Sequence, residues 1–153
     1  MKDTLKDKKA LWDKIKGIRF GMLTHRHPGG LLHSHPLATQ NQTLDDSSAL
    51  YFFISGRSAM ATLLREDAHV NVSYVSPEGE NYVSIAGVAH VTHDPQRIQQ
   101  LWSPLAEEGF PKGPNDPDLA LLAVEIQHAQ SWDAARGRMM PLFEQAVASS
   151  VAA

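Results

Sequence analysis

The chain has 153 residues, no cysteine and a formal net charge of −3, from 14 basic and 17 acidic residues. This length predicts one domain, with a hydrophobic core large enough to be stable without disulfides or a structural metal. The lack of cysteine excludes disulfides, thiolate nucleophiles and cysteine-ligated zinc. The charge balance argues against nucleic-acid binding, and the charged N-terminus with no long apolar run predicts a cytoplasmic protein without membrane association.

The N-terminal part is predicted to form a helix followed by a β-hairpin. Thr4–Lys16 places its apolar residues on one face, and Gly17 is suited to end this helix. Apolar and other residues alternate over Ile18–Thr24, which predicts a strand. The turn His25–Gly30 contains a proline and two glycines, so we expect Leu31–Gln40 to return as the partner strand.

A strand-to-helix turn in the segment Leu50–Met60 is the most informative local feature. Its apolar run as far as Ser55 predicts a buried strand, which breaks at Gly56 before a helix over Ala59–Glu66. The N–H groups of a helix N-terminus, with a hydroxyl and a guanidinium beside them, can hold an anion such as a phosphate. An ordinary capped turn is the alternative interpretation.

The second half of the chain adds further strands around one longer helix. Alternation predicts strands at Val70–Tyr74, Tyr82–Thr92, Leu122–Ile126 and Gln130–Asp133. Gly87 predicts a bulge, Asp94 and Pro95 a helix start, and Pro104 the end or a kink of that helix. The alanine-rich segment Pro141–Ala153 predicts a helical tail. Short strands separated by turns favour a small antiparallel barrel over a parallel sheet.

Four histidines lie close together in the predicted hairpin. His33 and His35 alternate onto one strand face, and the turn brings His25 and His27 towards them. A His-x-His pair can chelate zinc or copper. Because neither a cysteine nor an acidic residue in the hairpin completes such a site, we expect no metal here.

Several segments in a fixed order carry a family resemblance. They are Leu11-Trp12, Ile18-Arg19-Phe20, His33-Ser34-His35-Pro36-Leu37-Ala38, Tyr51-Phe52-Phe53, Tyr82-Val83-Ser84-Ile85-Ala86-Gly87, Leu101-Trp102-Ser103-Pro104, Phe110-Pro111-Lys112-Gly113-Pro114, Asp116-Pro117-Asp118-Leu119-Ala120-Leu121-Leu122 and Ser131-Trp132-Asp133. Together they cover about residues 10–135 and resemble the general stress protein branch of the pyridoxamine 5′-phosphate oxidase-like split barrels.

The resemblance implies a mainly β fold with flanking helices, a six-stranded antiparallel split β-barrel. It also implies one domain over residues 1–153, with an N-terminal helix at 1–17 and a C-terminal tail at 141–153. Such barrels form homodimers with a flavin at the interface.

The resemblance also implies the cofactor, FMN in preference to FAD, and a set of cofactor-binding residues. These are His35, Pro36, Leu37, Phe53, Ile54, Ser55, Arg57, Ser58, Met60, Ser84, Trp102 and Trp132. The two tryptophans are suited to cover a flavin ring, to fill a dimer interface or to pack in the core. Relatives usually have Arg, Thr and Lys where this chain has His35, Ile54 and Met60.

The function implied is that of an FMN-binding, stress-related protein, with weak oxidoreductase activity as one interpretation. A non-enzymatic flavin-binding or storage module is an alternative, and a dimeric barrel that no longer binds FMN is another. The sequence contains no Gly-x-Ser-x-Gly motif and presents no evident general acid or base. It therefore predicts neither catalytic residues nor a substrate.

Overall fold

The computed structural model describes residues 4–44, 48–76, 78 and 80–144. In chain order the elements are α1 (Thr4–Ile15), β1 (Phe20–Arg26), the 3₁₀ turn η1 (Pro28–Gly30), β2 (Leu32–Ala38), β3 (Ala49–Ser55), α2 (Ala59–Glu66), β4 (His69–Ser76), β5 (Asn81–Thr92), α3 (Pro95–Leu101), α4 (Ala106–Gly109), β6 (Leu119–Asp133) and β7 (Arg138–Glu144). No helix of this part is long and apolar enough to cross a membrane.

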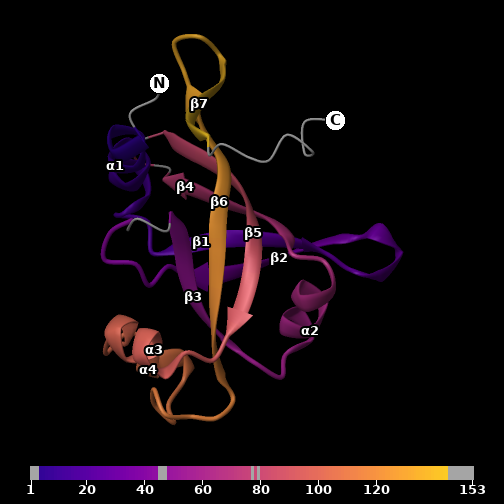
Figure 1. Cartoon of the computed structure of the whole chain (residues 1–153). Coiled ribbons are helices and arrows are strands. Elements are labelled where there is room, and N and C mark those ends of the chain that lie inside the picture. Colours follow the sequence, from indigo (N-terminus) through magenta and orange to yellow (C-terminus); the bar gives the residue numbers. More distant parts are fainter. Residues whose placement is uncertain (1–3, 45–47, 77, 79, 145–153) are drawn as a thin grey trace.

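The seven strands form one antiparallel sheet, in the order β2-β1-β4-β5-β6-β3 with β7 on β6 (Figure 1). The long strand β6 pairs with β3 through its first half, with β7 through its second half and with β5 along most of its length. No strand ladder joins β2 to β3 within the described residues. We call this opening the seam; the Gln40 N–H donates across it to the Tyr51 carbonyl at 2.8 Å.

The fold class expected from the sequence is confirmed, but the sheet has seven strands rather than six. The seventh is β7, so residues 141–144 form a strand and not the start of a helical tail. Gly137, at φ +65°, turns the chain back along β6, and a strand at the edge of a sheet tolerates Pro141. The rest of the expected tail lies outside the described residues.

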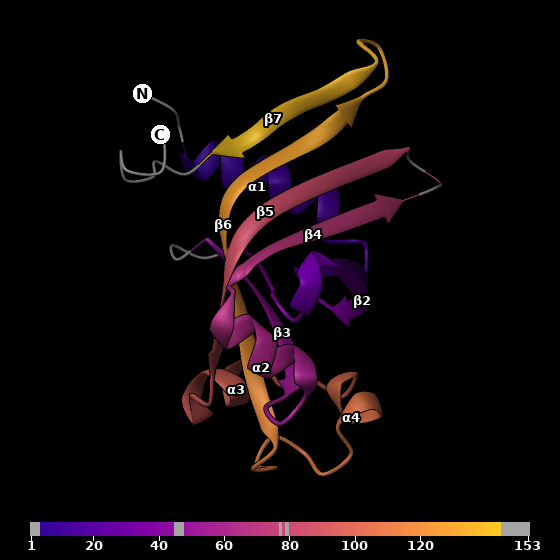
Figure 2. The ribbon, with the colours of Figure 1, turned by 90° about the vertical axis from the view of Figure 1, so that its right-hand side faces the viewer.

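The predicted helix starts are confirmed by their caps. The Ala61 N–H donates to Ser58 Oγ at 3.1 Å at the start of α2, and Asp94 Oδ1 accepts from the N–H groups of Gln96 and Arg97 at the start of α3. Figure 2 shows α1 at one end of the sheet, where it contacts β7 and β5, with α3 and α4 at the other end. The strands expected at 122–126 and 130–133 are parts of the single strand β6.

Strand β3 separates two apolar clusters because alternate residues point to opposite sides. Leu50, Phe52 and Ile54 lie in the main core, inside the curved sheet. Tyr51 and Phe53 lie in a smaller cluster that includes residues of α3 and α4. Both faces of β3 are therefore buried, which explains why the strand is apolar almost throughout.

Gly87 allows β5 to approach β6 closely at the predicted bulge, where the register shifts between Ala86 and Gly87. A Cβ at this position would lie 2.6 Å from Val124 Cγ1 and 2.7 Å from the Glu125 carbonyl oxygen. We expect Gly87→Ala to lower the free energy of unfolding by about 1–3 kcal/mol, measured by urea denaturation. Gly17→Ala is the control, because no atom lies within 4 Å of its Cβ. Equal stability of the two variants would contradict the prediction.

Tyr74 should make stability depend on alkaline pH. Its side chain is 1% exposed, its hydroxyl lies 2.6 Å from Thr39 Oγ1, and burial raises its pKa from 10.0 to about 12. The unfolded chain therefore loses this proton first, so the free energy of unfolding should fall by on the order of 1.4 kcal/mol per pH unit between these two values. Denaturation of Tyr74→Phe across the same pH range should lack this component, and identical pH profiles would refute the assignment.

Candidate functional site

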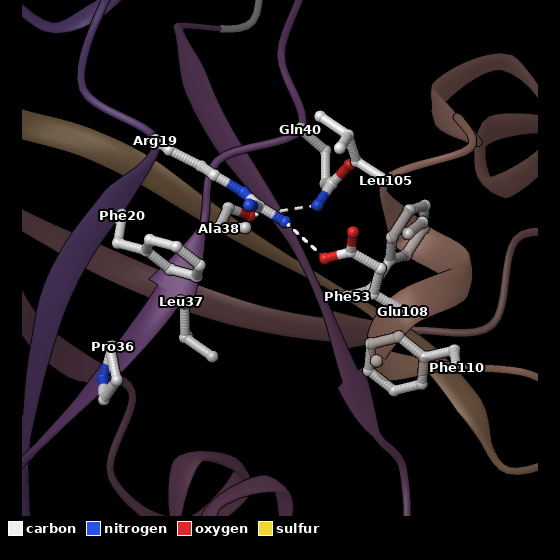
Figure 3. A pocket seen from close by; sticks show the side chains of 12 residues that line it. Arg19, Phe20, Pro36, Leu37, Ala38, Gln40, Phe53, Leu105, Glu108 and Phe110 are labelled. Atoms are coloured by element: carbon white, nitrogen blue, oxygen red, sulfur yellow. Dashed lines mark hydrogen bonds and ion pairs between the residues drawn. The ribbon is translucent and has the colours of Figure 1, made fainter.

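A pocket of about 400 Å³ lies at the seam between β2 and β3 (Figure 3). Pro36, Leu37 and Ala38 of β2 form one wall, and α4 forms the other. Phe53 of β3 lies between them. This volume falls in the range of roughly 300–1,000 Å³ typical of small-molecule sites. We call it the seam pocket.

Aromatic rings give the seam pocket a firm apolar wall. The Phe53 ring centroid lies 5.4 Å from that of Trp102 and 6.3 Å from that of Phe110, the latter pair edge to face. Phe53 is 5% exposed and belongs to the smaller apolar cluster, so its ring is fixed from behind. Such a wall suits a flat aromatic ligand.

Polar groups lie at the rim of the seam pocket. Arg19 Nη2 lies 3.1 Å from Glu108 Oε2, and the Arg19 guanidinium lies over the Phe20 ring at 4.9 Å. Gln40 Nε2 donates to the Ala38 carbonyl at 3.1 Å. Because the Arg19–Glu108 pair is exposed, it stabilises the fold by about 1 kcal/mol or less. These groups are therefore available to a ligand at little cost.

The turn after β3 has the geometry of a capped helix start. Ser58 Oγ donates to the Ser55 carbonyl at 2.7 Å while it accepts from Ala61. Arg57 Nε lies 2.8 Å from Asp118 Oδ1, with the arginine side chain 81% exposed. The N–H groups of Ala59 and Met60 have no acceptor among the described residues. They are the unpaired donors that a helix N-terminus presents to an anion.

Ile54 and Met60, both predicted to contact the cofactor, face elsewhere. Ile54 is 3% exposed and lies in the main core, and Met60 packs against that core. Neither side chain lines the seam pocket.

Ser84 and Trp132 lie on the face of the sheet opposite the main core, which we call the outer face. Ser84 Oγ accepts from Asn71 Nδ2 at 2.9 Å, across β4 and β5. Trp132 is 40% exposed and pairs with Met139 of β7. Pro36, which lines the seam pocket, also lies on this face because it pairs with the exposed Met22.

His35 lies in a cluster of histidine rings. Its ring centroid lies 5.3 Å from that of His25, which lies 4.6 Å from that of His27. Burial, together with the neighbouring imidazoles, holds the pKa of His25 below its usual range. One nitrogen from each of these three rings lies within 4.8 Å of the others.

One chain therefore brings together only part of the predicted cofactor site. Pro36, Leu37 and Phe53 line the seam pocket, with Trp102 behind Phe53. Ser55 ends β3, and Arg57 and Ser58 follow it in the turn before α2. The predicted residues His35, Ile54, Met60, Ser84 and Trp132 lie outside the pocket.

Sequence reasoning missed Arg19, Phe20, Gln40, Glu108 and Phe110 as pocket residues. Arg19, Phe20 and Phe110 belong to the segments that carry the family resemblance, and this membership was the signal that could have identified them as site residues. Glu108 lies 89 residues from Arg19 along the chain, so no local pattern links the two.

Residues 6–152 match the family model described as pyridoxamine 5′-phosphate oxidase like. No curated protein matches the chain.

Solved structures with a similar fold span nearly the whole chain. One is a protein related to general stress protein 26 from Clostridium acetobutylicum, with a TM-score of 0.75, 13% identity and coverage of 92% of this chain and 97% of that one. Another is a general stress FMN/FAD binding protein from Xanthomonas citri, with a TM-score of 0.71, 26% identity and coverage of 95% and 96%. A third is a pyridoxamine 5′-phosphate oxidase-related, FMN binding protein from Nostoc punctiforme, with a TM-score of 0.62, 15% identity and coverage of 90% and 91%.

Proposed function

The chain belongs to the pyridoxamine 5′-phosphate oxidase-like family, and from this premise we propose that it is an FMN-binding protein whose flavin ring occupies the seam pocket. The aromatic wall of this pocket is the observation that carries the proposal. Phe53 and Phe110 line the pocket with their rings edge to face with each other, and aromatic rings make favourable stacked or edge contacts with another aromatic ring such as an isoalloxazine. The FMN/FAD binding protein from Xanthomonas citri, 26% identical, supports the choice of a flavin.

The flavin phosphate is assigned to the turn that follows β3. Ser55 begins this turn two residues after Phe53, so one strand leads from the ring wall to the anion site. The unpaired N–H groups of Ala59 and Met60 and the guanidinium of Arg57 are the donors. Helix N-termini bind phosphate through such N–H groups and through the helix dipole.

A bound flavin would supply redox chemistry, and the chain would bind it, orient it and exclude water. The seam pocket offers one carboxylate, that of Glu108, and Arg19 holds it as an ion pair. The pocket therefore fits flavin binding better than it fits proton transfer. The protein then acts either as a weak oxidoreductase or as a flavin-storage module, and an assay of flavin reduction by NADH or NADPH distinguishes the two.

The outer face supports a homodimer with the flavin at its interface. Exposed apolar side chains cross the sheet on this face: Val75 pairs with Tyr82, Trp132 pairs with Met139, and Phe20 and Met22 lie on β1. Exposed apolar side chains gathered on one face are a common feature of interaction sites. Phe20 also lines the seam pocket, so the pocket opens next to this surface. A second copy would bring the outer-face residues Ser84 and Trp132 towards the flavin.

The purified protein should be yellow and should release FMN on denaturation. Arg57→Ala should weaken FMN binding by roughly tenfold because it removes a charge-assisted contact to the phosphate. Riboflavin, which lacks the phosphate, should bind both proteins equally in a fluorescence-quenching titration. Arg138→Ala, on β7, is the control.

A colourless protein that does not quench added FMN would contradict the proposal and leave a barrel without flavin. An equal loss of FMN and riboflavin affinity in Arg57→Ala would instead refute the position of the phosphate. Anaerobic mixing with NADH or NADPH then distinguishes an oxidoreductase, which reduces its flavin, from a storage module, which does not.

Val75→Asp should dissociate the dimer. Val75 is 52% exposed on the outer face, and an interface would bury the new carboxylate without a partner. We expect the dimer dissociation constant to rise by roughly a hundredfold, measured by analytical ultracentrifugation. Leu31→Asp is the control, because Leu31 is 66% exposed at the β1–β2 turn, outside this surface. A wild-type monomer, or equal effects of the two variants, would contradict the dimer assignment.

A further inference from the structure

The β1–β2 hairpin places four histidines on one face. His25 pairs with His33, and His35 pairs with Leu23, two residues from His25 along β1. Partners in an antiparallel ladder point to the same side of the sheet. This side is the one that carries the main core, because Leu23 is fully buried within it. The imidazole rings of the hairpin therefore lie on the same side of the sheet as the main apolar core.

The rings lie against one another at the end of the hairpin. His27, just past β1, has its ring centroid 3.8 Å from that of His33 and 4.6 Å from that of His25. One nitrogen each of His25, His27 and His35 lies within 4.8 Å of the other two. Tetrahedral coordination at Zn–N distances of about 2.0–2.1 Å requires nitrogens roughly 3.4 Å apart. The 4.8 Å limit within which the three nitrogens lie is wider than this spacing, so a bound ion would draw the rings together.

The buried ring of His25 is a second, independent indication of a ligand. His25 is 1% exposed, and neither of its ring nitrogens has a hydrogen-bond partner among the described residues. Nε2 of His27 is buried and equally unpartnered. A buried polar atom without a partner is costly to the fold. A metal ion bound between these rings would form a bond to one nitrogen of His25 and to one nitrogen of His27.

Within the part of the chain that the structure describes, no hydrogen bond reaches either ring nitrogen of His25 or Nε2 of His27. Asp67, which follows α2 just before the neighbouring strand β4, has its Oδ1 3.1 Å from His69 Nδ1 and its Oδ2 3.7 Å from Arg26 Nε. Thr24 and Ser34 bond to each other at 2.7 Å, and their pairing alternates with that of His25 and His33, which places them on the opposite side of the hairpin. His33 is exposed and its ring is stacked on that of His27, so the cluster borders on solvent at this residue.

We propose that His25, His27 and His35 bind a divalent transition ion, with Zn²⁺ as the representative, and that the fourth position is open to solvent or to His33. Imidazole nitrogens are suited to zinc, copper and nickel, and three histidines with one open position form an established type of zinc coordination. The sequence alone predicts no metal here, because neither a cysteine nor an acidic residue in the hairpin completes a site. The proposal rests on the hairpin alone and not on flavin binding.

Isothermal titration of the untagged full-length protein with Zn²⁺, after dialysis against a chelator, tests the site. We expect one tight ion per chain and a rise in the melting temperature with Zn²⁺, since the ion binds the folded state. His27→Gln and His35→Gln should each weaken binding by on the order of a hundredfold, because each removes a direct ligand and outer-shell changes alone cost ten- to a hundredfold. Both residues are only partly buried, so these variants are expected to fold.

His90→Gln is the matched control, because His90 lies on β5 outside the hairpin with its side chain 55% exposed. Cobalt(II) adds a readout, since tetrahedral nitrogen ligation gives strong visible absorption that His27→Gln should remove. No stoichiometric Zn²⁺ binding by the wild type, or equal affinity in His27→Gln and His90→Gln, would overturn the proposal. The affinity of His27→Gln for FMN separates the two sites: unchanged flavin binding with lost Zn²⁺ binding supports a metal site independent of the cofactor.

Discussion

The pairing of β3 with the first half of β6 is the contact on which the rest of the structure depends. It buries β3 on both faces, with Phe52 in the main core and Phe53 in the cluster beside α3 and α4. A fully buried aromatic side chain contributes about 1.5–3 kcal/mol through burial alone. Without this pairing the two clusters would lose their shared wall, and Phe53 would no longer be held against Trp102.

The same pairing determines where a ligand can bind. Since β3 forms its ladder with β6 and not with β2, the sheet stays open at the seam. An open strand edge is usually covered or charged, because it otherwise recruits other strands. Here α4 and the side chain of Gln40 lie over the opening and leave the seam pocket beneath them. The position of the pocket is thus a consequence of the topology, while Arg19, Gln40 and Phe110, which lie just outside the strands and helices, complete its rim and wall.

The sequence predicted the elements whose cause is local. Asp94 marked a helix start because its side-chain cap satisfies N–H groups two and three residues away, the break at Gly56 preceded the helix over Ala59–Glu66, and Gly87 marked the bulge. Strand β7 was missed because the alanine-rich segment Pro141–Ala153 predicted a helical tail, whereas the turn at Gly137 returns the chain to β6. The pocket rim and the contacts among the histidine rings depend on residues that folding brings together. Sequence spacing indicated that the histidines lie near one another, but it did not indicate that the ring of His25 is buried.

Strand β2 links the two candidate sites through simple alternation. Its residues His35 and Leu37 point to the same side of the sheet, about 7 Å apart along the strand. Leu37 packs against the main core and lines the seam pocket, while His35 belongs to the histidine cluster. As a strand at one end of the ladder, β2 is held by β1 alone among the described strands. An ion bound to His35 would therefore tie β2 to β1 through His25, and with it the wall of the pocket that Leu37 forms.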